Sequence, residues 1–227
     1  MIRFLHSSDL HLGKRFGQFP EGLRNRLTEA RHQTLHRLAT TARKSGTPLI
    51  LLAGDTFDSE TPAPATIRQA LGAMGDEGDL AWVLIPGNHD SRAADELWAL
   101  AAGHLPPNVT LAMEPAPLEV AQGFVVLPAP CTDRRPGRDL TGWMDDAATP
   151  DGVVRIGLAH GAVQEFGEEG ARDVIDPDRA RKAGLEYLAL GDWHGQMRIG
   201  ARTWYSGTPE PDRFKHDGPG RALLVSV

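Results

Sequence analysis

The feature that most constrains the fold of this chain is a repeated pattern in which a short apolar run ends in polar residues. Five such clusters occur among the 227 residues. They are Asp9-Leu10-His11, Gly54-Asp55, Gly87-Asn88-His89-Asp90, Ala159-His160-Gly161 and Gly191-Asp192-Trp193-His194. Short apolar runs are typical of buried strands, and the carboxyl ends of parallel strands form the crevice where α/β proteins bind ligands. The pattern therefore predicts an α/β fold with its polar groups gathered at one sheet edge.

The segments between the clusters agree with this fold. Amphipathic helices are expected at 22–44, 64–74 and 95–102, and their alternation with strands predicts parallel pairing through right-handed crossovers. Strands are expected at 2–7, 48–53, 80–85, 124–127, 153–159, 185–190, 203–205 and 222–227. A further helix is expected from Asp176-Pro177 to Gly184, with an acidic N-cap and a glycine stop. Because the linker-like stretch 128–142 is short enough to be a surface loop, we expect one domain over residues 1–227.

Composition excludes several classes of protein. The chain is 41% hydrophobic and 24% charged, near the globular average, which excludes disordered and collagen-like chains. No apolar run approaches the roughly 20 residues of a membrane span, and the N-terminus lacks the apolar segment of a signal peptide. The single cysteine, Cys131, forbids an internal disulfide. A lone cysteine fits a reducing compartment, so we expect a cytoplasmic protein.

The charge is unevenly distributed. The formal net charge of −6 argues at first against a nucleic-acid partner. Residues 1–46, however, contain nine Lys and Arg against three Asp and Glu. The candidate contacts to DNA phosphates in this basic segment are Lys14, Arg15, Arg24 and Arg26. The alternative is a solvated loop and helix face, and the same question applies to Arg134, Arg135 and Arg138.

The donor types in the five clusters indicate metal binding. Aspartate, histidine and asparagine form a mixed oxygen and nitrogen set, which suits Mn, Fe or Zn rather than Ca or a thiolate zinc site. Glycines beside four of the clusters let the backbone approach an ion closely. Each pair of residues alone has an ordinary alternative, such as a strand cap or a loop histidine. Asp58 lies outside the five clusters but close to Asp55, and we expect it to be a loop residue or a neighbour of a ligand.

The order D-x-H, GD, GNHD, H and G-x-x-H resembles the signature of the calcineurin-like metallophosphoesterases. The strings HSSDLHLG, LILLAGDTFDSETP, IPGNHDS, YLALGDWHG and WYSGTP are similar, more narrowly, to the SbcD-type DNA repair nucleases, and the likeness covers residues 2–227. The resemblance implies a four-layer α/β/β/α sandwich. Two mixed β-sheets would be flanked by helices, with a dinuclear metal site at the strand ends.

The same resemblance implies a role for each cluster. The first of two divalent ions would be held by Asp9, His11 and His194. The second would be held by Asn88, His160 and Asp192. Asp55 would bridge both ions. His89 would be the catalytic histidine beside the scissile phosphate, and Asp90 would orient it.

Two departures from the family pattern bear on function. Gly191-Asp192-Trp193-His194 stands where the family usually has G-H-x-H. An aspartate adds an oxygen ligand and should favour Mn²⁺, although Asp192 could instead accept a hydrogen bond from a metal-binding histidine. SbcD-type nucleases also continue into a capping domain and a segment that docks their ATPase partner. The sequence stops at Val227, so we expect no capping domain and no SbcC-type partner.

These observations predict a manganese-dependent DNA phosphodiesterase, a single-strand endonuclease acting in DNA repair. Its partners would be DNA, single-stranded rather than duplex, and other repair proteins. The alternative is a phosphodiesterase or pyrophosphatase that acts on a nucleotide or another small phosphate ester, because one scaffold supports all of these reactions. A non-catalytic scaffold is a third possibility, but such a protein should have lost ligands, and here only position 192 is exchanged.

Overall fold

The first half of the chain forms a largely parallel sheet in the computed structural model, which describes residues 2–163, 174–211 and 219–227. Its strands are β1 (Arg3–Ser7), β2 (Leu49–Leu52), β3 (Ala81–Leu84), β4 (Val109–Leu111) and β11 (Leu223–Ser226). The strand order is β11-β1-β2-β3-β4. All neighbours pair in parallel except β11, which runs antiparallel to β1. The parallel pairing predicted from the alternation of strands and helices is confirmed.

The second half forms another mixed sheet. Its strands are β5 (Leu118–Ala121), β6 (Phe124–Ala129), β7 (Val154–His160), β8 (Tyr187–Gly191), β9 (Met197–Arg198) and β10 (Thr203–Tyr205). The order is β5-β6-β7-β8-β10-β9. The four central strands are parallel, whereas the edge strands β5 and β9 are antiparallel to their neighbours.

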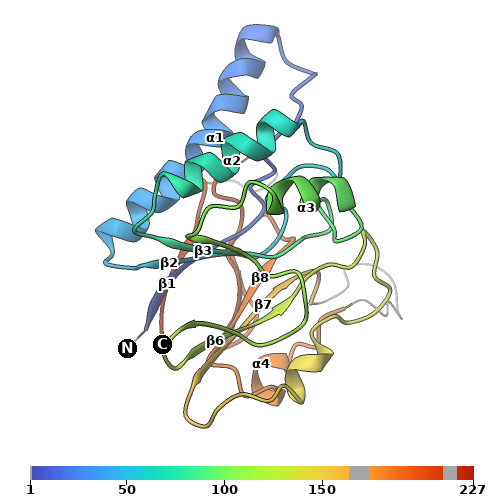
Figure 1. The fold of residues 1–227 in the computed structure, drawn as a ribbon. Helices are drawn as coiled ribbons and strands as arrows, with labels where there is room; N and C mark the ends of the chain where they lie inside the picture. The colour runs from blue at the N-terminus through green and yellow to red at the C-terminus, as the bar shows by residue number, and fades with distance from the viewer. Residues whose placement is uncertain (1, 164–173, 212–218) are drawn as a thin grey trace.

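Helices cover the outer face of each sheet (Figure 1). Helices α1 (Glu21–Lys44), α2 (Pro64–Gly75) and α3 (Asp95–Ala102) lie on the first sheet, and η1 (Gly142–Asp145) and α4 (Arg179–Lys182) lie on the second. Three buried apolar clusters separate these four layers. The predicted α/β/β/α sandwich is therefore confirmed. None of the described helices is long and apolar enough to cross a membrane.

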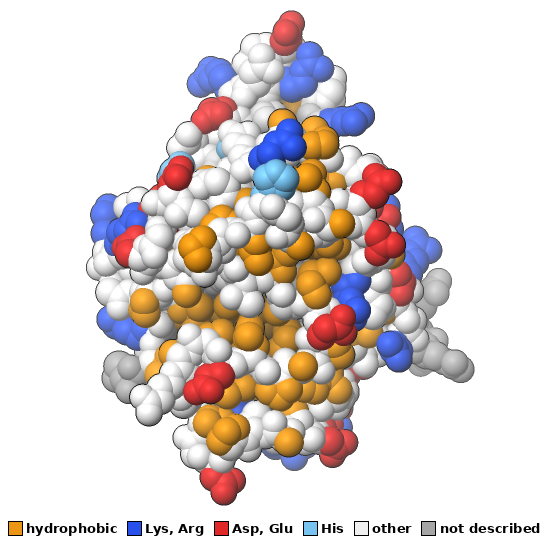
Figure 2. Space-filling model, viewed as in Figure 1, with side chains coloured by type: hydrophobic (Ala, Val, Ile, Leu, Met, Phe, Trp, Pro, Cys, Tyr) orange, Lys and Arg blue, Asp and Glu red, His pale blue; other side chains and the backbone are white. Residues whose placement is uncertain are grey.

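The two sheets face each other through an apolar layer. Phe4 of β1 packs against Phe124 of β6 and Tyr187 of β8, with ring centroids 5.8 and 5.6 Å apart. Buried His6 joins the sheets by hydrogen bonds to the Tyr187 hydroxyl at 3.0 Å and the Leu190 carbonyl at 3.2 Å. Figure 2 shows apolar side chains across the middle of one face, at the level of the sheets, with charged side chains mainly around them.

The predicted start of α4 and the predicted end of β6 are wrong. The helix expected from Asp176 begins at Arg179, because Asp176 instead accepts the Asp178 amide in a preceding turn. The strand expected to end at Leu127 continues to Ala129, so the linker-like stretch begins inside β6. Pro128 is tolerated there because its paired neighbour is Leu158 of β7, while the ladder to β5 extends only as far as Val126.

Candidate metal centre

The seven predicted ligands all lie where strands end on the same side of the sandwich. They come from the segments after β1, β2 and β3, from the last residue of β7, and from the segment after β8. The residues so placed are Asp9, His11, Asp55, Asn88, His160, Asp192 and His194. Parallel strands within each sheet bring these segments to one edge, as expected for a ligand site in an α/β fold.

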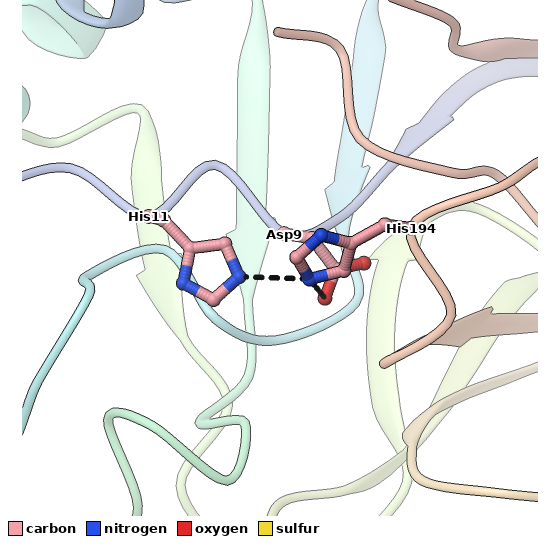
Figure 3. A group of neighbouring side chains, drawn as sticks. All are labelled: Asp9, His11 and His194. Atoms are coloured by element: carbon pink, nitrogen blue, oxygen red, sulfur yellow. Dashed lines mark hydrogen bonds and ion pairs between the residues drawn. The ribbon is translucent and has the colours of Figure 1, made fainter. Parts of the chain in front are cut away.

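The first group consists of Asp9, His11 and His194 (Figure 3). The Nε2 atoms of His11 and His194 are 3.2 Å apart, and His194 Nε2 lies 3.9 Å from Asp9 Oδ1. Figure 3 shows the two imidazole rings pointing toward each other with the carboxylate beside them. These three side chains are the ones expected to hold the first ion.

The second group lies on the other side of Asp55. His160 Nε2 is 3.5 Å from Asp55 Oδ1 and 3.8 Å from Asp192 Oδ1, and Asn88 donates its amide hydrogen to Asp192 Oδ1 at 2.9 Å. The other Asp55 oxygen, Oδ2, is 3.7 Å from His11 Nε2. Asp55 therefore lies between the two groups, and its bridging role stays a prediction.

Unpaired buried atoms show that this donor set fits a cation. His160 Nδ1 lies 2.8 Å from the Ala53 carbonyl, which can only accept a hydrogen bond. In the neutral ring the proton must then be on Nδ1, which leaves Nε2 as a bare acceptor facing the acids. His160 Nε2 and Asn88 Oδ1 are both buried without a hydrogen-bond partner in the described part of the chain. Leaving such atoms unpaired costs about 1–3 kcal/mol each, which a metal ion would offset.

The charge balance of the site leads to the same conclusion. Burial disfavours a charged His160, but Asp55, Asp9 and Asp192 outweigh it and raise the His160 pKa to about 9. Burial also raises the pKa of Asp9. Several carboxylates in one buried place favour any available positive charge, whether a proton or a metal ion. The geometry of Asp192 agrees with a ligand role, since its carboxylate faces His160 Nε2, whereas the distal nitrogen of His160 is held by Ala53.

Backbone strain is concentrated at these residues. Among the described residues, four that are not glycine have a positive φ between 47° and 101°, namely Asp9, His11, Asp55 and Asp192. Such conformations are uncommon for residues with a side chain and persist where the surrounding structure imposes them, often at functional sites. All four are predicted ligands.

The close contact between Gly87 and Asp55 explains why the GNHD segment begins with glycine. A Cβ on Gly87 would lie 2.2 Å from Asp55 Oδ1 and 2.4 Å from the Asp55 backbone nitrogen. Only a glycine lets this loop pass close to the bridging candidate. The loop then places the amide of His89 2.9 Å from Asp55 Oδ1, so its backbone helps to orient that carboxylate.

The predicted role of Asp90 in orienting His89 is wrong. The buried Asp90 carboxylate accepts hydrogen bonds from the backbone amides of Phe57 at 2.9 Å and Gly87 at 2.6 Å. It therefore ties the segments after β2 and β3 together. His89 Nδ1 instead lies 3.0 Å from the Asp58 carbonyl, which places a proton on Nδ1, and the His89 ring lies 4.9 Å from the His11 ring between centroids. The GNHD motif alone could not show this, because the partner is a backbone atom of another segment.

Asp58 has a more specific position than the sequence indicated. Its Oδ1 lies 3.3 Å from His11 Nδ1, the nitrogen of His11 that points away from His194, and 3.3 Å from Lys14 Nζ. Burial opposes the charge on Asp58, but the contacts with His11 and Lys14 hold its pKa below the usual range. A carboxylate on the distal nitrogen is the arrangement that orients metal-binding histidines.

The basic residues predicted to bind DNA differ in their surroundings: one contacts an acid near the ligands, and three are exposed. Lys14 makes the contact with Asp58 just described. Arg15 is exposed, and Arg24 and Arg26 lie on the first, exposed turns of α1, which extend beyond the sheet (Figure 1). No contact among the described residues joins these three arginines to the ligands, so their role stays a prediction.

Several supporting residues were missed from the sequence. Buried Arg31 of α1 donates to the Leu10 carbonyl at 2.7 Å and so holds the loop between Asp9 and His11. The Asp9 carboxylate accepts a hydrogen bond from Ser8, and the Asp9 carbonyl accepts one from Thr208 at 2.9 Å. An arginine within an amphipathic helix gives no sequence signal that it is buried.

The comparisons with known proteins agree with this geometry. Residues 2–196 match the calcineurin-like phosphoesterase family, and the chain belongs to that family. It is therefore a metal-dependent hydrolase of the phosphoesterase class. The chain is 39% identical over 94 residues to the SbcD component of the nuclease SbcCD of Bacillus subtilis (strain 168), a match that covers 40% of this chain and 22% of that protein.

Two further proteins are similar over most of the chain. The uncharacterized metallophosphoesterase YhaO of Bacillus subtilis (strain 168) is 24% identical over 245 residues, covering all of this chain and 57% of YhaO. The matches thus span less than two thirds of either curated relative. The crystal structure of TT1561 of Thermus thermophilus superposes with a TM-score of 0.58 at 12% identity, covering 91% of this chain and 89% of that one. This likeness supports the fold.

Proposed function

We propose that this protein is a manganese-dependent phosphodiesterase that cuts single-stranded DNA internally and acts in cytoplasmic DNA repair alongside other repair proteins. The observation that carries the proposal is the pair of ligand groups that share Asp55, one with facing His11 and His194 nitrogens and one with the unpaired His160 Nε2. Such a pair of groups suits two-metal hydrolysis of a phosphate ester.

The chemistry divides between the metal ions and the chain. Two divalent ions held by these groups would activate a water and offset negative charge on the phosphoryl oxygens. Asp55 lies between the two ligand groups, and the hydrogen bond from the His89 amide holds its carboxylate in place. With Nδ1 held by the Asp58 carbonyl, His89 can protonate the leaving oxygen from Nε2 when its ring enters the reaction as the doubly protonated imidazolium, which then becomes the neutral Nδ1–H ring.

The choice of manganese rests on the donor set. Asp9, Asp55, Asn88 and Asp192 supply oxygen donors, and three histidines supply nitrogen. This set is harder than the histidine-rich version expected for the family and is suited to Mn²⁺. The choice of DNA rests on the similarity to a nuclease component over 94 residues and on Arg134 and Arg138, which line a cavity beside His160 and Asp192.

The test is incubation of the purified protein with single-stranded circular DNA and Mn²⁺, with His89→Ala as the matched variant. We expect nicked circles with the wild type and at least about 100-fold slower nicking with the variant, since general acid catalysis contributes about 10²–10⁴-fold. Turnover of bis-p-nitrophenyl phosphate without any nicking would favour a small phosphodiester as the substrate. Nicking that His89→Ala leaves unchanged would overturn the proposed role of this site.

A further inference from the structure

One cavity opens beside the metal centre, on the side of His160, and a second cavity adjoins it. The first, of about 220 Å³, is lined at one end by His160 and Asp192 and elsewhere by Arg134, Arg138 and apolar side chains. The second, of about 300 Å³, is lined by residues that include Trp143 and Arg92. The ligand residues therefore form one wall of the first cavity.

The two cavities are neighbours. Both are lined by Ala129, Arg138 and Leu140, so Arg138 lies where they meet. The first cavity borders the metal ligands, and the second is lined by Trp143 in η1. We call the surface formed by the two cavities and the shared Arg138 the Arg138 groove. Its lining combines apolar side chains, three arginines and the Trp143 ring with several polar groups, among them the carboxylates of Asp192 and Asp139. Arginines beside an aromatic ring occur on surfaces that bind single-stranded nucleic acid.

The charge on Arg138 is available to a ligand. Arg134 and Arg138 are exposed, and neither makes a hydrogen bond or an ion pair within the described residues. The backbone beside Arg138 is nevertheless held firmly. The Asp139 carboxylate accepts hydrogen bonds from the Thr141 amide at 2.8 Å and from Arg179 at 2.9 Å. A guanidinium on a fixed backbone, without an internal partner, suits bidentate binding of a phosphate.

The sizes of the cavities limit what can bind. Pockets for drug-sized ligands measure about 300–1,000 Å³, so each cavity takes one small unit, such as a single base with its sugar. A base in the first cavity must leave the stack, which costs least when the strand is unpaired. The half-buried Trp143 packs against the apolar cluster under the second sheet and also lines the second cavity. An indole at such a wall is a candidate to stack on a base.

We propose that the Arg138 groove binds the two nucleotides adjacent to the scissile phosphate. The first nucleoside occupies the cavity beside His160, the following phosphate contacts the Arg138 guanidinium, and the next base stacks on Trp143. The inference rests on the proposed function, and it assigns selection for single strands to the segment between β6 and η1.

The test measures steady-state cleavage of a single-stranded oligonucleotide at several salt concentrations, with hydrolysis of bis-p-nitrophenyl phosphate measured in parallel. The variants are Arg138→Ala and Trp143→Leu. The matched control is Arg202→Ala, because Arg202 precedes β10 at the amino ends of the parallel strands, away from the site. Thermal melts check that each variant folds, and Arg138→Glu provides a second test of the same position.

We expect Arg138→Ala to lower kcat/KM on the oligonucleotide about 10-fold more than on the small diester. It should also reduce the dependence of log KM on log salt by about 0.7, the value for loss of one phosphate contact to a single strand. Trp143→Leu should raise KM for the oligonucleotide, and less so when an abasic site replaces the stacked base. Arg202→Ala should match the wild type.

The outcomes separate the groove from the proposed function. If the wild type hydrolyses neither substrate with Mn²⁺, the proposed function fails. If the wild type cuts the oligonucleotide while Arg138→Ala and Arg138→Glu keep the wild-type kcat/KM ratio and salt dependence, the groove proposal fails.

Discussion

Charged side chains on the two sides of the metal centre differ in whether they have partners within the protein. On the side of the first sheet, charged groups near the ligands are satisfied within the protein. Asp58 contacts His11 and Lys14, and Asp90 accepts two backbone amides. On the side of the second sheet, the segment after β6 carries Arg134 and Arg138 with no partner among the described residues.

This difference shows that a basic residue near a site does not by itself mark where a substrate lies. The sequence has its strongest positive charge in residues 1–46, but part of that charge is used internally. Arg31 supports a ligand loop, and Lys14 neutralises Asp58. The less basic second half places unpaired arginines in a groove that reaches the ligands. A basic side chain is available to a substrate when it has no partner within the protein, and the fold decides which side chains have partners.

The largest effect should come from the residue that joins the two sides. Asp55→Asn keeps the shape of the side chain but removes the charge between the two ligand groups. We expect hydrolysis of bis-p-nitrophenyl phosphate to fall more than about 1,000-fold, since metal-ion catalysis supplies several kcal/mol and each 1.36 kcal/mol is tenfold. Metal analysis after Mn²⁺ loading should show fewer ions per chain. A variant with full metal content and full activity would contradict the bridging position.

The second effect concerns Arg179, which holds the segment that follows Arg138. Arg179 of α4 is buried and contacts Asp139 at 2.9 Å, Thr141 at 3.0 Å, and Asp145. Arg179→Met leaves both carboxylates without their partner. We expect a loss of about 2–3 kcal/mol in urea unfolding, less than the roughly 3–5 kcal/mol of a fully buried pair because the acids are partly exposed. Arg181→Met, at an exposed pair on the same helix, is the control, and equal losses in the two variants would disprove the anchor.

The third effect tests internal pairing on the first side. Asp58→Asn should lower activity about 10- to 100-fold, the usual cost of losing a partner that orients a metal ligand. Because the loss acts through His11 and the metal, added Mn²⁺ should restore part of the rate. Asp76→Asn, an exposed acid at the end of α2, is the matched control. A rate deficit that does not respond to Mn²⁺ would argue against positioning of His11.

The smallest effect concerns the contact between the sheets beneath the site. Burial lowers the pKa of His6 to about 3, against the opposing effect of the Leu190 carbonyl. The folded protein therefore keeps His6 neutral while the unfolded chain binds a proton below about pH 6.5, so stability falls as pH falls. Between pH 6.5 and 5.5 the loss should be about 1 kcal/mol.

Urea unfolding at the two pH values measures this slope. His6→Gln should remove that share of the slope, whatever its effect at neutral pH, whereas His104→Gln at an exposed histidine serves as the control. An unchanged slope in His6→Gln would show that the inter-sheet histidine titrates alike in both states.

The sequence by itself determined the α/β class, the strand-end placement of the polar clusters and the candidate ligand residues, because apolar strand runs and glycine-flanked Asp, His and Asn clusters are local signals. The four-layer sandwich came from the resemblance of the ordered motifs to a known family. Only the tertiary structure decided the partners. It paired His89 with the Asp58 carbonyl rather than Asp90, moved the start of α4 to Arg179, and buried Arg31 under the ligand loop.

The same holds for the groove. Nothing in the segment 134–143 distinguishes a solvated loop from a binding surface, because exposed arginines occur in both. The packing of β6 against β7 and the anchoring of Asp139 by Arg179 place Arg138 between two cavities next to His160. Contacts between residues far apart in the chain carry no local pattern, so they became visible only when the fold brought them together.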